Sequence, residues 1–209
     1  MTDSPRLLKG AIVGLDKFNP TASAIVFQYN PNSMTRKLEP RTSGGDGDKS
    51  EAFRLIGPPK ETISFKIELD ATDRLAEEDP LTILAGVYPT LAALEMLVYP
   101  KFAAVNANLA LSASGMIEII PPEAPLALFI WGLVRVVPVR VTSLDITEKA
   151  WDTQLHPIDA DVLVTLQVLS YHDLKETHRG FSLFGAYHYS KELMGSLNVS
   201  NSAQTIVLR

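Results

Sequence analysis

ETISFKIELDA, residues 61–71, alternates apolar and polar side chains along most of its length. Ile63, Phe65 and Ile67 fall on one side of an extended chain, because successive side chains of a strand point to opposite faces. Strict alternation of this kind is typical of a strand with one buried face and one solvated face. The segment therefore predicts a half-buried strand over 61–70.

Strand-like segments dominate on both sides of this stretch. Two short apolar runs, 10–15 and 23–29, precede it and are separated by the turn dipeptide at 19–20. Residues 139–147 follow it, and 159–171 form the longest predicted strand, with an apolar face opposite an amphipathic one. The sequence therefore predicts a mainly β chain.

Residues 126–134 differ from the other predicted strands because they are apolar in both alternating positions, as Leu128 and Phe129 illustrate. Such a strand lies at the centre of a layered sheet or is covered by another subunit. Gly132 and Pro138 indicate a bend or edge position between it and the next strand.

One helical segment interrupts the strands. Asp79 followed by Pro80 is typical of an N-cap with proline at the first helical position. Apolar residues over 81–98 share one helical face, Pro89 gives a second start, and Pro100 ends the segment. We expect one helix here, broken or restarted near Pro89.

The fold class that follows is α+β: a mainly antiparallel sandwich or open barrel with one inserted helix. Residues 39–60, rich in glycine, proline and mixed charges, are expected to form a long loop that is either mobile or ordered by a neighbour. A short helix is expected around Ser190–Met194.

Composition excludes several classes of protein. The chain has 209 residues, a net charge of −5 and no cysteine, which excludes disulfide scaffolds, thiolate nucleophiles and iron–sulfur clusters. The acidic balance argues against nucleic acid as a partner. The longest uncharged apolar run, 124–134, is too short to span a bilayer, so we expect no membrane insertion and assembly in the cytoplasm.

No catalytic, metal or cofactor motif stands out. The four histidines are not spaced to place two imidazoles on one helix face: His156, His172, His178 and His188. Asp145, Glu148 and Asp152 lie near Trp151, and paired carboxylates of this kind can suggest a glycosidase. Their spacing is also that of a strand end that enters a loop, where acidic residues are common. We therefore expect a binding or assembly protein, not an enzyme, with no cofactor and no metal.

A set of short motifs, in a fixed order, resembles the tube-initiator proteins of phage-tail-like contractile injection systems, which often carry a LysM module behind a tube-like domain. The motifs are FQYNPNS (27–33), ETISFKIELDA (61–71), LAALEMLVYP (91–100), LFIWG (128–132), PVRVTSL (138–144), and ITEKAW (146–151) leading into LHPIDA (155–160). The motif positions expected to be structural are Phe27, Tyr29, Asn30, Pro31, Trp131, Gly132 and Trp151. The 39 residues after residue 170 are too few for a full LysM module with a linker, and this is where the chain departs from the family.

The resemblance implies a structural part rather than an enzyme. Such proteins form stacked hexameric rings, and the initiator ring joins the inner tube to the spike and templates tube polymerisation. A tube-like domain over 1–175 and a C-terminal docking segment over 176–209 are expected. Partners would be five further copies, the inner-tube protein, the spike or hub protein and other baseplate subunits, in a particle that is assembled in the cytoplasm and then released or active outside the cell.

Two segments are predicted to form the interfaces: the 39–60 loop and the aromatic run within 176–209. Their proposed contact residues are Phe53, Leu55, Ile56, Phe181, Phe184 and Tyr187. Three alternatives stay open: a main inner-tube subunit, a glycan- or peptidoglycan-binding module, and a hydrolase that uses the acidic group near Trp151.

Overall fold

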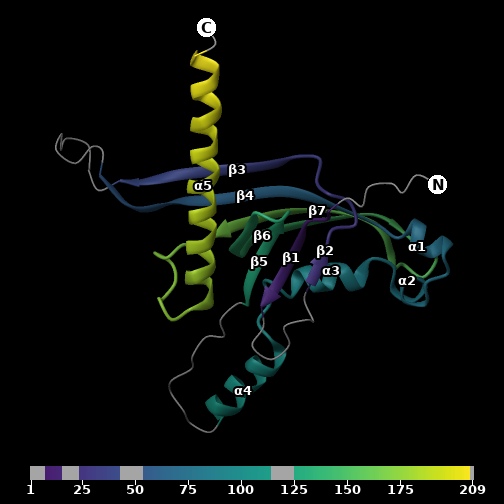
Figure 1. The fold of residues 1–209 in the computed structure, drawn as a ribbon. Coiled ribbons are helices and arrows are strands. Elements are labelled where there is room, and N and C mark those ends of the chain that lie inside the picture. The colour runs from purple at the N-terminus through teal and green to yellow at the C-terminus, as the bar shows by residue number, and fades with distance from the viewer. Residues whose placement is uncertain (1–7, 16–23, 43–53, 114–124, 208–209) are drawn as a thin grey trace.

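The computed structural model describes residues 8–15, 24–42, 54–113 and 125–207, with side chains as far as residue 198. Within this part of the chain, seven strands form one sheet in the order β2-β1-β5-β6-β7-β4-β3, and every neighbouring pair is antiparallel (Figure 1). The strands are β1 (Ala11–Leu15), β2 (Ala24–Val26), β3 (Met34–Thr42), β4 (Leu55–Asp70), β5 (Leu126–Trp131), β6 (Arg135–Trp151) and β7 (Pro157–Val168).

The expected mainly antiparallel α+β fold is confirmed, but in a simpler form. The described strands lie in one sheet instead of two stacked sheets, and this sheet does not close into a barrel. Its two outermost strands, β2 and β3, each have a neighbour on one side only. Among the described residues, no further strand pairs with either edge of the sheet.

The alternation that predicted the half-buried strand is confirmed in β4. Phe65 lies opposite Val164 and Ile67 opposite Val162 in the register with β7, and all four side chains are buried. Lys66 and Glu68, one residue out of phase, are exposed. Because the side-chain period of a strand is two, the register places one apolar layer on a single face of the sheet.

Within the described residues, four helices lie between β4 and β5 where one was expected, and the restart expected near Pro89 is confirmed, because α3 begins at Tyr88 with Pro89 in its first turn. They are α1 (Thr72–Ala76), α2 (Pro80–Ala85), α3 (Tyr88–Glu95) and α4 (Phe102–Ala113). The predicted cap is confirmed: the Asp79 carboxylate accepts a 3.0 Å hydrogen bond from the Thr82 N–H, with Pro80 in the first turn. Gly86 ends α2 at φ 57°, and a Cβ there would lie 2.1 Å from the Pro157 carbonyl oxygen. Turns that end one helix and begin the next thus divide this segment into more helices than its apolar pattern indicated.

Two helices cover the apolar face of the sheet. Leu91 and Leu94 of α3 join the same buried cluster as Phe184 and Tyr187 of α5 (Arg179–Val207). Both pairs meet strand residues such as Phe65 that point to this face. The core therefore lies between one face of the sheet and two helices, α3 and α5, which are far apart in the sequence.

The predicted loop at 39–60 is wrong at both of its ends. β3 continues to Thr42 and β4 begins at Leu55, and the pairs include Glu39 with Lys60 and Thr42 with Leu55. Pro40 is compatible with this ladder because β3 is an edge strand, where a missing N–H can face away from the sheet. The two strands form a long hairpin arm that extends past the rest of the sheet (Figure 1); residues 43–53, with Phe53, lie outside the described part.

The C-terminal segment is one long helix instead of the short one expected around Ser190–Met194. α5 has 29 residues, packs against β6 by its first turns, and then projects beyond the sheet (Figure 1). Its glycines, Gly180, Gly185 and Gly195, and its many serine and asparagine residues weaken the sequence signal for a helix.

Candidate interaction surfaces

Two side-chain amides of the FQYNPNS motif fasten the crossing from β2 to β3. The Gln28 side chain donates to the Asp70 carbonyl at 2.7 Å and accepts from the Asp70 N–H at 3.1 Å. The Asn30 side chain donates to the Leu8 carbonyl and accepts from the Gly10 N–H, both at 2.9 Å. Each amide thus satisfies one backbone N–H and one backbone carbonyl, as a neighbouring strand would. The two amides of the motif therefore serve to satisfy backbone hydrogen-bonding groups, and most side-chain hydrogen bonds in proteins are made to backbone or water.

The aromatic members of the motifs build the core. Phe27, Phe65 and Phe129 follow one another with ring centroids 5.5 Å and 5.2 Å apart, and Trp131 stacks on Phe129 at 6.0 Å. A Cβ on Gly10 would come within 2.8 Å of both Phe27 and Trp131, so this glycine permits the close approach. The prediction that Trp131 is a core residue and not a ligand platform is consistent with this packing.

Gly132 and Trp151 have different surroundings. Gly132 takes φ 73° in the turn between β5 and β6, a conformation that favours glycine. Trp151 ends β6, is half exposed, and donates its ring N–H to the Glu148 carboxylate at 2.9 Å. Its exposure leaves it available for a contact, whereas Trp131 is partly buried against the core.

The remaining motif residues, Tyr29 and Pro31, border a surface hollow of about 390 Å³. Asn32 and Ser33 line the same hollow, together with side chains from β4. The Tyr29 hydroxyl lies 3.5 Å from an Asp73 carboxylate oxygen. An exposed aromatic ring beside amide and hydroxyl groups is a combination that sugar-binding sites use.

The acidic group considered for hydrolysis does not converge on one point. Glu148 accepts from Trp151, Asp145 from the Ser143 hydroxyl at 3.1 Å, and Asp152 from backbone and side-chain donors of its own turn. The backbone hydrogen bond from His156 is the main reason that the pKa of Asp152 lies below its ordinary value, and burial only partly opposes it. Carboxylates that are each committed to a local partner do not form an acid–base pair.

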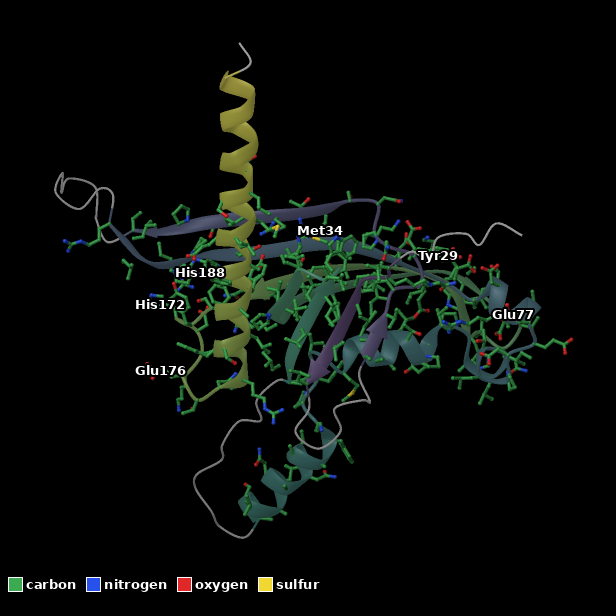
Figure 2. All side chains as sticks on the ribbon, viewed as in Figure 1. Tyr29, Met34, Glu77, His172, Glu176 and His188 are labelled. Atoms are coloured by element: carbon green, nitrogen blue, oxygen red, sulfur yellow. The ribbon has the colours of Figure 1, made fainter. Side chains whose placement is uncertain are left out.

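The histidines also serve local structure. His172 Nε2 lies 2.8 Å from the Ile56 carbonyl oxygen of the hairpin arm, and a Cβ on Gly57 would overlap the His172 ring. His156 Nδ1 lies 2.9 Å from Asp152. Figure 2 places His172 and His188 near the base of α5, far from Tyr29 and Glu77. Among the described residues, no group of three or more histidine, aspartate or glutamate side chains could hold a metal ion.

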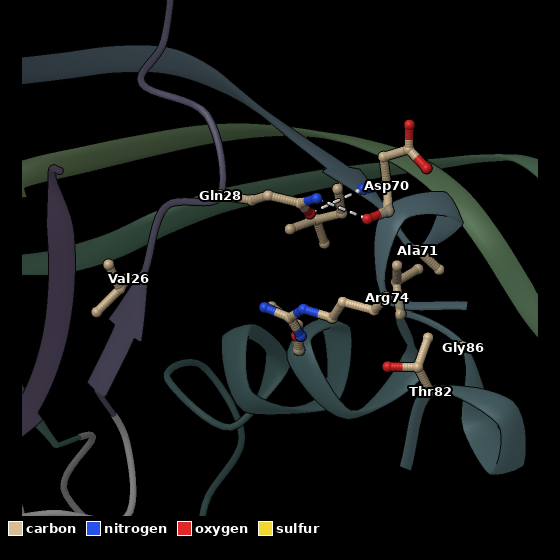
Figure 3. A pocket seen from close by; sticks show the side chains of 10 residues that line it. Val26, Gln28, Asp70, Ala71, Arg74, Thr82 and Gly86 are labelled. Carbon is tan, nitrogen blue, oxygen red and sulfur yellow. Dashed lines mark hydrogen bonds between the residues drawn. The ribbon is translucent and has the colours of Figure 1, made fainter. Parts of the chain in front are cut away.

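A second, smaller hollow lies between β4, the β2–β3 crossing and the α1–α3 region (Figure 3). Gln28, Asp70 and Arg74 line it, and the Arg74 side chain reaches across it. Its volume is about 30 Å³, which is the space of about one water molecule. It is therefore too small to bind a substrate.

Glu61 is the strongest buried electrostatic feature of the described residues. Its side chain is 3% exposed and accepts from Arg36 Nε at 2.9 Å, Lys191 Nζ at 2.8 Å and the Tyr187 hydroxyl at 3.2 Å. Lys191 also lies 4.2 Å from the centroid of the Tyr187 ring. Burial alone would raise the pKa of Glu61, but the hydrogen bonds from Lys191 and Arg36 outweigh it and hold this pKa below its ordinary value. We call these four residues the Glu61 clasp; it ties α5 to β3 and β4.

The predicted contact residues fall into two groups. Leu55 and Ile56 are exposed on the hairpin arm, while Phe53 lies outside the described residues. Phe184 and Tyr187 are buried within the chain and Phe181 is partly buried, so none of the three is a freely exposed contact of the single chain. The exposed apolar side chains of α5 are instead Tyr189, Leu193, Met194 and Leu197. Their spacing of three to four residues could have identified them, had the helix been predicted at its full length.

The face of the sheet opposite the core is polar over β4, β7 and β6. Lys66 and Lys149 approach the two carboxylate oxygens of Asp161, at 2.9 Å and 2.7 Å. The hydrogen bond from Lys149, with a second from Lys66, holds the pKa of Asp161 below its ordinary value, and burial only partly opposes them. Leu163 is the large apolar side chain exposed on this part of β7.

No protein-family model matches this chain, and a search of curated proteins finds no match either. No helix of the described residues is long and apolar enough to cross a membrane.

Proposed function

We propose that this chain is a structural subunit of a contractile injection system, a tube-initiator ring of six copies that joins the inner tube to the spike. The ordered motifs of the sequence and the surfaces of the fold support this proposal independently of each other. In a ring, each copy would cover the sheet edges of its neighbours, and the machine would act mechanically, without turnover of a substrate.

The observation that carries the proposal is the open sheet. β3 is a nine-residue edge strand and β2 is the edge strand at the far side. Open edges invite pairing with another chain, and proteins normally block them or pair them. Ring closure by repeated copies is the ordered way to pair them, because a repeated head-to-tail contact that closes leaves no free edge.

The two faces of the sheet suit the same arrangement. α3 and α5 cover one face, while the ion pairs of Lys66, Lys149 and Asp161 stand on the other. A sheet with one face packed and one solvated is normal for antiparallel strands. In a tube, the solvated face would line the water-filled lumen and the helices would lie outside it.

The hairpin arm would carry contacts to the adjoining ring or baseplate. Leu55 and Ile56 are exposed where β4 begins, well beyond the part of the sheet that packs a core. His172 and Asp173 hold the arm from the turn before α5, with Arg41 3.4 Å from the Asp173 carboxylate. A braced arm with exposed apolar groups is the kind of element that docks on a partner.

The test uses one substitution at two positions. Leu38 on edge strand β3 is 47% exposed and Leu163 on interior strand β7 is 46% exposed. β3 already carries Lys37 and Pro40, which leaves Leu38 as its exposed apolar side chain for an edge contact. A further lysine at this position disfavours edge-to-edge pairing, so Leu38→Lys should abolish the hexamer in analytical ultracentrifugation while Leu163→Lys keeps it. Hexamers in both variants, or a wild-type chain that is monomeric throughout, would refute the ring.

One other observation favours a second candidate, a glycan- or peptidoglycan-binding module. The hollow beside Tyr29 combines an exposed aromatic ring with the polar side chains of Asn32 and Ser33. Calorimetry with soluble peptidoglycan fragments tests it: binding that is lost in Tyr29→Ala would support a glycan site, and an absence of binding by the wild-type chain would exclude it. A main inner-tube subunit would differ from the initiator only in forming many rings per particle.

A further inference from the structure

We propose that the surface around α2 binds a basic amphipathic helix of a partner protein. α2 lies at one end of the sheet (Figure 1). Five large apolar side chains on it and beside it are each more than half exposed, and we call them the α2 patch: Leu81, Ile83, Leu84, Tyr88 and Leu155. The proposed contact is with a different protein, so it does not rest on the ring of six copies.

The fold brings the members of the α2 patch together from two separate parts of the chain. Gly86, which follows α2, lies against the turn between β6 and β7, and a Cβ on it would be 3.7 Å from the His156 Cβ. The Val87 N–H donates to the Pro157 carbonyl at 2.8 Å. Leu155 comes directly before these two turn residues, so its side chain emerges beside the end of α2.

The outward side of α2 is apolar throughout. Thr82 is the buried residue of this helix, and its hydroxyl donates to the Asp79 carboxylate. Because each residue turns a helix by about 100°, Leu81 and Ile83 flank Thr82, and Leu84 points away from it. These three leucine and isoleucine side chains are 53–69% exposed. A surface helix normally carries polar residues on its outward side, so this pattern is typical of a contact surface.

The charges around the α2 patch define the chemistry of the partner. Residues 80–94 contain no charged side chain, whereas residues 70–79, which lead into α2, contain five acidic residues and one arginine. Asp73, Glu77 and Glu78 are exposed, and Figure 2 shows Glu77 at the outer end of this region. An apolar centre with a negatively charged rim is complementary to an apolar stripe flanked by lysine or arginine.

Two residues of this region are held in a conformation that glycine adopts more readily. Glu78 has φ 55° and Leu155 has φ 67°, and they are the non-glycine residues with positive φ in the described part of the chain. A Cβ is sterically disfavoured in this conformation, and such strained residues cluster at binding sites. Here the strained backbone places one carboxylate on the rim and one leucine, which is 79% exposed, in the patch.

The size of the α2 patch fits one helix. A fully exposed apolar side chain of this kind offers roughly 100 Å², so five that are 53–79% exposed present about 300 Å². This is the lower end of the range for surface patches that carry a function. An amphipathic helix presents three to four apolar side chains in every two turns, which matches this area. The patch offers side chains and not unpaired backbone groups, which favours a helix over an added strand.

The test measures binding of synthetic helices to the full chain. The first is a fluorescently labelled peptide of about 18 residues, long enough to form a helix, with leucine on one face and lysine on the other. The second has glutamate in place of every lysine. We expect the lysine peptide to bind, as measured by fluorescence anisotropy, and the glutamate peptide to bind at least about tenfold more weakly. Equal binding of the two peptides, or no binding of the lysine peptide, would overturn the proposal.

Glycine substitutions separate this site from general attraction to an acidic chain. Leu155→Gly and Glu78→Gly each remove a side chain and relieve a positive φ, so both variants should keep or raise the melting temperature. We expect the lysine peptide to bind about tenfold more weakly to Leu155→Gly and about threefold more weakly to Glu78→Gly. The matched controls are Leu193→Ala on α5 and Glu176→Gln, which Figure 2 places far from Glu77; both should bind the peptide within about twofold of the wild-type chain.

Unchanged binding in both glycine variants would overturn the proposal, and so would equal weakening in the two controls, which would indicate nonspecific attraction between opposite charges. A second copy of the chain is the other occupant to be tested. If sedimentation shows a self-associated species that Leu84→Ser loses and Leu163→Ser keeps, the chain covers the patch itself and the partner helix is refuted. The ring is tested separately at Leu38 on the edge strand β3, so failure of one proposal does not imply failure of the other.

Discussion

The two halves of α5 belong to one helix but have opposite surroundings. Its first half places Phe184 and Tyr187 in the core and Lys191 on the buried Glu61 carboxylate. Its second half extends beyond the sheet with Leu193 and Leu197 exposed. Most helical stability comes from packing of an apolar face, not from intrinsic propensity. The difference shows that packing on the sheet accounts for the first half of the helix but not for the exposed apolar side chains at 193 and 197.

The largest loss of stability is expected from a substitution that removes the centre of the Glu61 clasp. Glu61→Ala leaves Arg36 and Lys191 without their buried carboxylate partner. Because these two cations are about one third exposed and can be solvated, the cost should lie near the lower end of the range for breaking a buried ion pair, at about 3–4 kcal/mol. Urea denaturation should show this loss in the free energy of unfolding. Glu68→Ala, on the exposed face of the same strand, is the control and should change little. Equal effects in the two variants would contradict the role of the clasp.

Acid should weaken the docked half of α5 through the same carboxylate. The folded-state pKa of Glu61 lies below its ordinary value of 4.5. A group of this kind stabilises the folded chain fully above its unfolded pKa, and the stability is lost as the pH falls through the folded pKa. The free energy of unfolding should therefore decrease below about pH 4.5.

Glu61→Gln serves as the matched variant for this pH dependence, because its amide does not titrate. The slope of stability against pH between pH 5 and 3 should be shallower in Glu61→Gln than in the wild-type chain. Identical slopes would mean that other carboxylates, such as Asp173, dominate acid unfolding.

The mildest change removes one oxygen. Tyr187→Phe deletes the hydroxyl that lies 3.2 Å from Glu61 and keeps the ring that packs on Phe184 and beneath Lys191. The hydroxyl donates to Glu61 and accepts from Arg36, both at 3.2 Å. Loss of these two long hydrogen bonds to charged groups should cost about 1.5–3 kcal/mol, less than Glu61→Ala. Thermal melting would resolve the order of the two variants, and a Tyr187→Phe effect as large as that of Glu61→Ala would place the energy in the hydroxyl and not in the charges.

The sequence predicted the parts of the fold that depend on local alternation. Apolar and polar side chains alternate from Ile63 to Leu69 because one face of β4 packs against α3 and α5 and the other faces solvent. This pattern can be recognised in the sequence without knowing which elements lie next to the strand. The cap at Asp79 was predictable for the same reason, since its bond to Thr82 spans only three residues.

Features that depend on distant partners were not predictable. Pro40 seemed to exclude a strand, but it is tolerated because β3 is an edge, and only the topology shows this. Phe184 and Tyr187 had the composition of contact residues, yet they pack on the chain's own sheet. The clasp joins Arg36, Glu61 and Lys191 across more than 150 positions of sequence, and the backbone bonds of Gln28 and Asn30 likewise gave no pattern that a single sequence reveals.

Electron microscopy of the purified wild-type chain tests the proposed structural role most directly. We expect ring-shaped particles with six-fold symmetry in class averages, each subunit placing its polar sheet face toward the central opening. Single separate molecules at every concentration, or closed two-fold pairs without an opening, would contradict the proposal that this chain is a ring-forming part of an injection machine.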